Sequence, residues 1–420
     1  MPADPQRVVI TGVGVAAPGA WGYERFGQHL LQGESGIRGI TLFDCASHEC
    51  QVAGEVADLD RHDPLPAAER RKVSRPVPLA LAAAREALDS AGLSDDAFDE
   101  DARERTGVIL GSGAGGIEYT ESQYETFFDR GSRRTSPYAI VASFVGMLAS
   151  EVSIFFRLRG PSHVLSTGCT SATDAMGYAL MQLRAGNLDR VITGGVEACI
   201  TPAIVASFAK MGTVATRWNR EPAKAARPFS RDRDGFVLSE GAWVFVFETE
   251  RSARTRGAAP RAEVAGYGST SDAYHRVQVM RGGEEPARAI QIALRDAGAD
   301  PSAVDHVSLH GTGTELNDLA ETRAVKIALG RRAAAIPSPR PSRSSVTRRE
   351  ASGALGVAAV LTAMERGAVP PTINLDEPDP ELDLDYTPHR AREHKVSVAV
   401  ANCIAFGAKN SALVLRALPR

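Results

Sequence analysis

The sequence has no run of about 18 apolar residues, so no membrane-spanning helix is expected. Its first residues, "MPADPQRVVITGVGV", lack the charged-then-apolar order of a signal peptide, and the expected location is the cytoplasm. The five cysteines (45, 50, 169, 199 and 403) are an odd number without a CxxC pair, which argues against a disulfide framework and a zinc site. Neither sign of charge dominates, since the net charge is -3, and nucleic acid is not an expected partner.

What the sequence does contain is an alternation of short β-branched runs with helical runs. The 420 residues are 43% hydrophobic and can bury a large core. A first half starts with "RVVITGVGV" and closes with "GAWVFVFETE", and a second half starts with "RAEVAGYGST" and closes with "VSVAVANCIAFGAKNSALVLRA". The switching period predicts a layered α/β fold. The similar order of elements predicts two duplicated halves, 1–255 and 256–420.

The run "HVLSTGCTSATDAMGYAL" places a cysteine between a strand and a helix. The strand breaks at Gly168, and Cys169 then stands at the start of a helix expected from Thr170. Free backbone N–H groups and the helix dipole favour thiolate over thiol at such a position, which predicts a nucleophile. The alternative is a buried structural cysteine, but the strand-Gly-Cys-helix placement favours the reactive one.

The run "SLHGTGTELNDLAETRAV" presents a histidine at a strand end. His310 is followed by two glycines that allow a sharp turn, and Asp318 with Glu321 form a capping-box pattern for the following helix. The C-terminal end of a strand is a usual place for α/β active sites, so a functional His310 is favoured over a packed one. Thr312 and Thr314 could offer hydroxyl groups to a substrate.

Two further runs are more ambiguous. "ANCIAFGAKNSALVL" is explained by a hairpin, in which Phe406 between small residues could also act as a gate. "RPFSRDRDGFVLSEGA" predicts a salt-bridged turn, with Glu240 as an internal partner for Arg231 and Arg233.

Taken in order, these motifs and "VVITGVGV" resemble the elongating β-ketoacyl-acyl carrier protein synthases. The resemblance covers essentially the whole chain, and the "TGCTS" form is most similar to ketosynthase subunits of bacterial type II polyketide synthases. It implies the thiolase-like fold, two duplicated α/β halves in an αβαβα layered architecture, and no cofactor other than the phosphopantetheine of an acyl carrier protein. It also implies a homodimer, or a heterodimer with a chain-length-factor subunit.

The resemblance also implies roles for residues. Cys169 would take the acyl group, malonyl carrier protein would lose CO2, and the carbanion would attack the Cys169 thioester. The amides of Cys169 and Phe406 would form the oxyanion hole, and His310 would stabilise the enolate. The presence of Cys169 argues against a chain-length factor, which lacks the nucleophile. The basic run "ERRKVSR" (Arg70, Arg71, Lys72, Arg75) is a candidate docking patch for an acidic carrier protein.

One segment departs from the family. "IPSPRPSRSSVTRREASGALG", residues 336–356, has the composition of a linker but stands where the family has a lysine and a second histidine. Ungapped matching places Ser342 at the lysine position and Thr347 at the histidine position. Reading residues 338–350 one base earlier can restore the lysine, glycines and histidine in register. Two compensating shifts of the reading frame are therefore the favoured explanation, which sequencing of codons 330–356 would test.

A true loss of both residues would favour other functions. One alternative is a non-decarboxylating acyltransferase that uses Cys169 and His310. Another is a structural subunit of a synthase complex. The leading interpretation remains a condensing enzyme of polyketide or fatty-acid synthesis.

Overall fold

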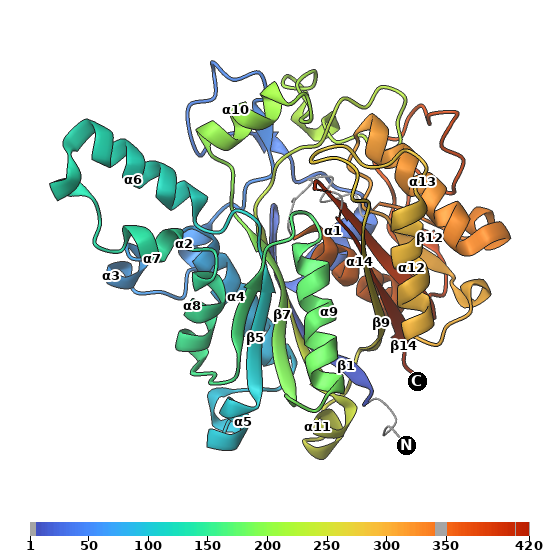
Figure 1. Cartoon of the computed structure of the whole chain (residues 1–420), viewed down its shortest axis with the longest axis horizontal. Coiled ribbons are helices and arrows are strands. Elements are labelled where there is room, and N and C mark those ends of the chain that lie inside the picture. Colours follow the sequence, from blue (N-terminus) through green and yellow to red (C-terminus); the bar gives the residue numbers. More distant parts are fainter. Residues whose placement is uncertain (1–5, 341–350, 408, 420) are drawn as a thin grey trace.

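The computed structural model describes residues 6–340, 351–407 and 409–419 of the chain. Five layers follow one another across the molecule (Figure 1). They are an outer pair of helices, α4 (Pro76–Ser90) and α8 (Met147–Phe156); strands β1 (Val8–Ala17), β5 (Thr106–Gly111), β6 (Ser162–Leu165), β7 (Arg190–Glu197) and β8 (Gly241–Thr249); the central helices α9 (Ser171–Arg184) and α14 (Ser352–Arg366); strands β9 (Ala262–Ser271), β10 (His306–Ser308), β13 (Val398–Ala405) and β14 (Lys409–Ala417); and α12 (Glu284–Asp296) with α13 (Glu315–Leu329).

The same topology occurs twice, which confirms the expected duplication. The hydrogen-bonded strand order is β10-β13-β14-β9-β1-β8-β7-β5-β6, and only two residue pairs join β1 to β9. In the first half, β1 with β8 and β8 with β7 pair antiparallel, and β7 with β5 pairs parallel. In the second half, β9 with β14 and β14 with β13 pair antiparallel, and β13 with β10 pairs parallel. Helices α4, α8 and α9 of the first half therefore correspond to α12, α13 and α14 of the second.

Close contacts between strand and helix repeat in both halves. A Cβ atom added at Gly12 or Gly14 of β1 would come within 2.0 or 1.9 Å of a backbone oxygen of α4. One added at Gly266 or Gly268 of β9 would come within 2.3 or 2.2 Å of a backbone oxygen of α12. Only glycine allows the helix to approach the strand this closely. The pairs "GVG" and "GYG" are thus the same packing feature in the two halves.

The structure also shows a counterpart of β6 in the second half. Residues 336–340 run beside β10, since Val307 N–H donates to Pro337 O at 3.4 Å and Leu309 N–H donates to Pro339 O at 3.2 Å. Ser338 is 0% exposed. Residues 336–340 are therefore buried extended chain. Their composition suggests a solvated linker, and for these residues that expectation is wrong. The prolines at 337 and 339 remove two N–H donors from the strand position.

The remaining α-helices and β-strands lie around these layers (Figure 1). They are β2 (Ala20–Trp21), α1 (Tyr23–Gln32), β3 (Arg38–Gly39), β4 (Val52–Ala53), α2 (Leu59–His62), α3 (Ala67–Arg70), α5 (Glu100–Glu104), α6 (Ile117–Arg130), α7 (Ala139–Ser143), α10 (Pro202–Lys210), α11 (Glu250–Thr255), β11 (Ala368–Val369) and β12 (Arg392–Glu393). Helix α10 lies at one end of the layers, and α5 and α11 lie at the other. Helix α6 projects from the body of the molecule (Figure 1). Among the described residues, no helix is long and apolar enough to cross a membrane.

Candidate active site

Cys169 lies in a tight turn between β6 and α9. Gly168 has a φ of 75°, a left-handed conformation that glycine adopts without strain. The Ser171 hydroxyl donates to Gly168 O at 2.6 Å and accepts from the Thr167 N–H at 2.9 Å, which closes the turn. Cys169 is 5% exposed and stands two residues before the helix begins. The predicted strand-turn-helix placement of Cys169 is confirmed.

A buried carboxylate supports this turn and was not found from the sequence. Asp174, on the first turn of α9, accepts from the Thr167 hydroxyl at 2.6 Å and from the Tyr267 hydroxyl of β9 at 2.7 Å. Burial and the Asp174 charge raise the pKa of Tyr267, so the phenol stays a donor. The only local signal is the acidic residue within "TSATD", because the partner tyrosine lies 93 residues away.

His310 follows β10 and turns into the same pocket. Its Nδ1 lies 3.5 Å from the Sγ of Cys403, and its Nε2 is buried without a hydrogen-bond partner among the described residues. Burial, helped by the charge of Arg340, lowers the pKa of His310 to about 3. The imidazole is therefore neutral at physiological pH and can offer an N–H group without carrying charge.

Two carboxylates hold the turn after His310, and here the expected capping box is wrong. Helix α13 begins at Glu315, earlier than predicted, so Asp318 and Glu321 lie inside it. Glu321 accepts from the N–H groups of His310 and Gly311 at 2.6 and 2.7 Å, and Asp318 accepts from Gly313 at 3.1 Å. Burial raises the pKa of Glu321 to about 7. Gly311 and Gly313 have positive φ angles and let the backbone of this turn fold over the start of α13. The N–H groups of the turn can therefore reach the two carboxylates.

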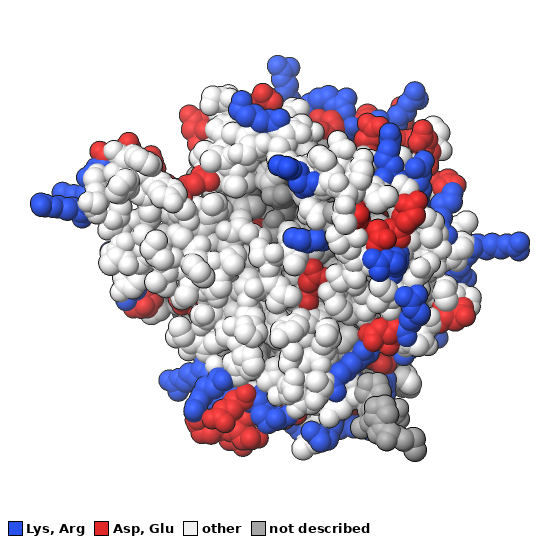
Figure 2. All heavy atoms as spheres, viewed as in Figure 1, with Lys and Arg blue, Asp and Glu red and all other residues white. Residues whose placement is uncertain are grey.

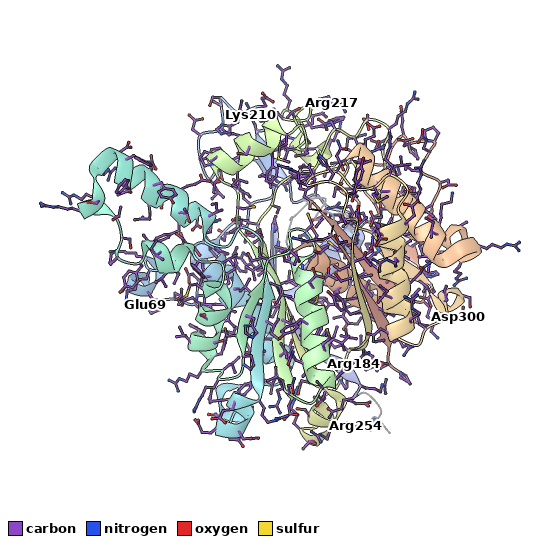
Figure 3. All side chains as sticks on the ribbon, viewed as in Figure 1. Glu69, Arg184, Lys210, Arg217, Arg254 and Asp300 are labelled. Atoms are coloured by element: carbon purple, nitrogen blue, oxygen red, sulfur yellow. The ribbon has the colours of Figure 1, made fainter. Side chains whose placement is uncertain are left out.

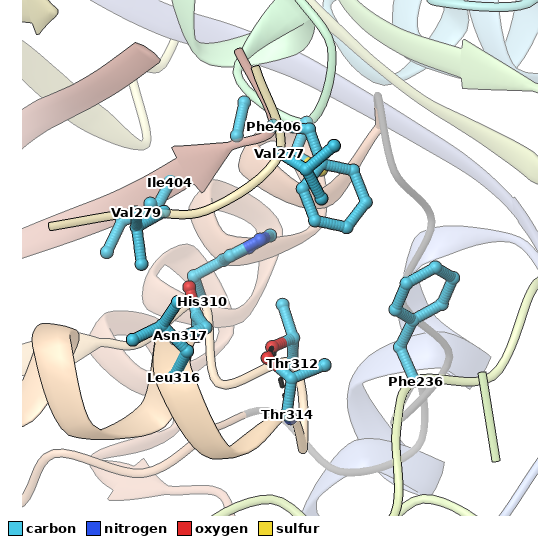
Figure 4. A pocket seen from close by; sticks show the side chains of 12 residues that line it. Phe236, Val277, Val279, His310, Thr312, Thr314, Leu316, Asn317, Ile404 and Phe406 are labelled. Atoms are coloured by element: carbon cyan, nitrogen blue, oxygen red, sulfur yellow. Dashed lines mark hydrogen bonds between the residues drawn. The ribbon is translucent and has the colours of Figure 1, made fainter. Parts of the chain in front are cut away.

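The pocket has a cavity volume of about 60 Å³ and is partly open to solvent. Its lining combines Cys169 and His310 with residues of four other segments: Phe236, Val277, Val279, Thr312, Thr314, Leu316, Asn317, Ile404, Ala405 and Phe406. Figure 4 shows the His310 side chain directed toward Phe406 and Val277, with the Phe236 ring across the pocket. Thr312 and Thr314 hydrogen-bond each other at 2.7 Å. The structure thus brings together Cys169, His310, Phe406 and the two threonines, as predicted.

Other predicted residues have different positions. Ser342 and Thr347 lie outside the described residues. Arg75 does not belong to a surface patch, because Glu240, 0% exposed, binds it at 2.6 Å; this also corrects the expected pairing of Glu240 with Arg231 and Arg233. Arg233 instead binds Asp379 at 2.8 Å.

Lys72 and Arg70 of the same basic run are partly neutralised, because they pair with Glu69 and Asp63 at 2.7 and 3.1 Å. Within the described parts of the chain, no group of three or more potential metal-ligating side chains is placed to hold an ion.

A duplicated αβαβα fold with a cysteine at a helix N-terminus and a neutral histidine in one pocket defines a class of acyl-transferring condensing enzymes. Comparison with known proteins agrees with this class. Residues 5–253 match the family described as "Beta-ketoacyl synthase, N-terminal domain", and residues 261–376 match "Beta-ketoacyl synthase, C-terminal domain". The chain belongs to the β-ketoacyl synthase family.

Individual relatives cover almost the whole chain. A "3-oxoacyl-[acyl-carrier-protein] synthase 2" of Synechocystis is 38% identical over 413 residues, 98% of each chain. "Granaticin polyketide putative beta-ketoacyl synthase 1" of Streptomyces violaceoruber is 39% identical over 417 residues, again 98% of each. A chain of the solved complex "type II PKS acyl-carrier protein in complex with its ketosynthase bound to the hexaketide" is 31% identical, with a TM-score of 0.88, and the match covers 99% of this chain and 100% of that one.

Proposed function

We propose that this chain is a β-ketoacyl-acyl carrier protein synthase that extends an acyl chain by decarboxylative Claisen condensation. The observation that carries the proposal is the meeting of Cys169 and His310 in one pocket, at the ends of strands from opposite halves of the fold. A nucleophile alone would serve any acyl transfer. The neutral histidine beside it adds a donor for an oxygen on which negative charge develops.

In the first step, the Cys169 sulfur attacks the carbonyl carbon of an acyl thioester on a carrier protein. The bond to the phosphopantetheine sulfur breaks, that thiol leaves with a proton, and a Cys169 thioester remains. The N-terminus of α9 favours the thiolate that begins this step. The chain needs no cofactor of its own for it, because the phosphopantetheine arrives on the substrate.

In the second step, malonyl carrier protein replaces the first carrier. The carboxylate leaves as CO2, and its bonding electrons form an enolate whose oxygen accepts from His310 Nε2–H. The enolate carbon then attacks the Cys169 thioester, and the amides of Cys169 and Phe406 stabilise the tetrahedral oxyanion. Collapse of this intermediate releases the Cys169 thiolate and the lengthened β-ketoacyl thioester. Thr312 and Thr314 would bind the pantetheine arm.

The printed residues Ser342 and Thr347 weaken only the second step. Losing one preorganised donor to a developing oxyanion costs roughly 3 kcal/mol, on the order of a hundredfold in rate. Formation of the Cys169 thioester needs neither position. The chain as printed is therefore expected to decarboxylate malonyl groups slowly and to remain acylated at Cys169.

We also propose two protein partners. The first is an acyl carrier protein, whose acidic surface would be attracted to basic side chains near the pocket. Lys210 and Arg217 lie at the end of the molecule that carries the hollow seen in Figure 2, as the labels in Figure 3 show. Arg217 belongs to the segment that precedes Phe236, a residue of the pocket wall. The likeness to a ketosynthase solved with its carrier protein supports this partner.

The second partner is another subunit, either a copy of this chain or a chain-length factor. Strand β6 ends the described sheet, and helix α8 packs against it. Helices α6 and α8, and α7 with its two flanking residues, expose large apolar side chains: Tyr124, Phe127, Phe128, Tyr138, Ile140, Val141, Phe144 and Ile154. We call these eight residues the apolar face. Phe128 and Ile140 are 78% and 77% exposed. An exposed apolar surface of this kind, together with a sheet that ends at β6, supports subunit contact.

The proposed function is tested by giving the purified chain an acyl carrier thioester and malonyl carrier protein. Acylation of Cys169, released CO2 and a lengthened product are measured separately, with Cys169→Ala as the control that removes only the nucleophile. CO2 together with a longer product supports condensation. Acyl-Cys169 without CO2 would mean a non-decarboxylating acyltransferase, and no acylation at all would mean a structural subunit.

A further inference from the structure

The side chain of Arg340 is buried directly beneath the turn that carries His310. Arg340 is 5% exposed, and its Nη1 donates to the carbonyl oxygen of His310 at 2.5 Å. Its own N–H donates to the Thr372 hydroxyl at 2.9 Å, which fixes the backbone at the end of the extended segment 336–340. A Cβ atom added at Gly311 would lie 3.1 Å from the Arg340 Cδ. The arginine is thus packed against the strand end and is not a surface side chain.

The same turn is held from its other side by two buried carboxylates. Glu321 accepts from the N–H groups of His310 and Gly311, and both Glu321 and Asp318 are 0% exposed. Arg233 lies 3.7 Å from Asp318 and offsets the charge of that carboxylate. The charge of Glu321 then remains to be offset. Burial lowers the pKa of Arg340 to about 10, opposed by the attraction of the two carboxylates, so the guanidinium stays charged at neutral pH.

We propose that, in the chain as written, Arg340 is a positioning residue for His310, which anchors the strand end that carries the imidazole and places a positive charge beside it. Its effect on decarboxylation rests on the proposed function, whereas its effect on His310 does not. Burial is the main reason that the His310 ring stays neutral, and the guanidinium beside it makes an imidazolium more costly still. The Arg-to-carbonyl bond fixes the backbone from which the ring projects toward the substrate.

The groups that face His310 come from every element around it. Cys403 of β13 lies at Nδ1, and Cys169 of the β6–α9 turn lines the same pocket. On the backbone side are Arg340 and the carboxylates of α13. Burial raises the pKa of Cys403 well above its ordinary value, so the thiol next to the ring carries no charge near neutral pH. Arg340 is therefore the cation, among the described residues, that the geometry places against His310 itself.

The test uses a gene that encodes the printed sequence and the variants Arg340→Met and Arg340→Lys. Arg332→Met is a matched control, because Arg332 Nε donates to Val304 O at 2.8 Å and so makes a similar arginine-to-carbonyl bond before β10. The His310 titration is followed by NMR, with its signal assigned by its loss in His310→Asn. Acylation of Cys169 and release of CO2 from malonyl carrier protein are measured alongside.

In Arg340→Met the midpoint of the His310 titration is expected to rise by about one pH unit. Decarboxylation should fall at least about tenfold, while Cys169 acylation stays within about twofold. Arg340→Lys should keep the low midpoint and recover part of the CO2 release, and Arg332→Met should leave both unchanged. An unmoved midpoint in Arg340→Met, or the same shift in Arg332→Met, would overturn the proposal.

Two outcomes separate this proposal from the proposed function. If the parent chain releases no CO2, condensation fails as its function, and the His310 titration alone still decides the role of Arg340. If Arg340→Met does not fold, Arg340→Lys decides, since a midpoint at the ordinary histidine value of about 6.5 would contradict the role of the charge.

Discussion

Cys169 lines the pocket and Cys403 is buried beside it, and their surroundings give the two thiols opposite chemistry. Cys169 stands two residues before α9, where the positive end of the helix dipole favours a thiolate. Cys403 is 0% exposed, and its thiol donates to the carbonyl oxygen of Cys169 at 3.0 Å. Burial raises the pKa of Cys403 far above that of a free thiol. The Cys169 sulfur is therefore the proposed nucleophile, and the Cys403 thiol is a hydrogen-bond donor to its backbone.

Alkylation should separate these two thiols. At pH 7 a small haloacetamide is expected to modify Cys169 in the folded chain at least about tenfold faster than Cys403, because only the thiolate reacts. Intact-mass and peptide analysis of the parent and of Cys169→Ala measure both rates. Cys403→Ser, which keeps a donor to Cys169 O, is the control for altered geometry. Equal rates at both cysteines would contradict the assignment.

At the residue scale, the sequence predicted the groups that touch substrate better than the groups that hold them. Cys169 and His310 follow strands and precede helices, a local pattern that the sequence displays. The partners Cys403, Tyr267 and Arg340 come from distant parts of the chain, and no local pattern marks them. Their roles depend on which strands become neighbours in the sheet, which only the fold decides.

At the element scale, the duplicated topology explains why an unpromising segment belongs to the site. Residues 336–340 lie beside β10 as β6 lies beside β5, and α14 follows as α9 follows Cys169. Composition alone favoured a linker, since from residue 337 to 350 the segment holds three prolines, four serines and four arginines. The structure of these residues is decided by their position in the repeat and not by their composition. Ser338 and Arg340 are buried because their segment pairs with β10.

Gly177 and Gly356, one on each central helix, differ in the space around them, and a pair of matched substitutions should show it. A Cβ atom at Gly177 of α9 would come within 2.4 Å of the Tyr267 ring, whereas one at Gly356 of α14 would come no closer than 3.3 Å to the Ser308 hydroxyl. Gly177→Ala is therefore expected to lower the free energy of unfolding by about 1–3 kcal/mol through overpacking. Gly356→Ala should change it little or raise it by up to about 1 kcal/mol, because alanine favours helix.

Denaturant unfolding of both variants measures this difference. Because Tyr267 also donates to Asp174 behind Cys169, Gly177→Ala should slow acylation of Cys169 as well, and Gly356→Ala should not. Equal stabilities of the two variants would mean that the Tyr267 ring moves aside without cost.

At the scale of the whole molecule, charge is unevenly distributed over the surface. Figure 2 shows charged side chains gathered around the margins, while the area over α8 and β5 is nearly free of them. The apolar face lies on α6, α7 and α8, with Phe127 and Phe128 in edge-to-face contact at 5.3 Å between ring centroids. The sequence could not show this face, because its apolar residues have the helical spacing that also predicts core packing.

A single charge on the apolar face should therefore change the assembly. If this face contacts a second subunit, Phe128→Asp buries an unpaired carboxylate there and should weaken association at least about tenfold. Sedimentation at several concentrations measures the change in mass. Ile327→Asp is the matched control, because Ile327 is 48% exposed on α13, in the outer layer at the opposite side of the stack. A parent chain that sediments as a monomer would favour pairing with a different subunit, whereas an unchanged dimer in Phe128→Asp would place the interface elsewhere.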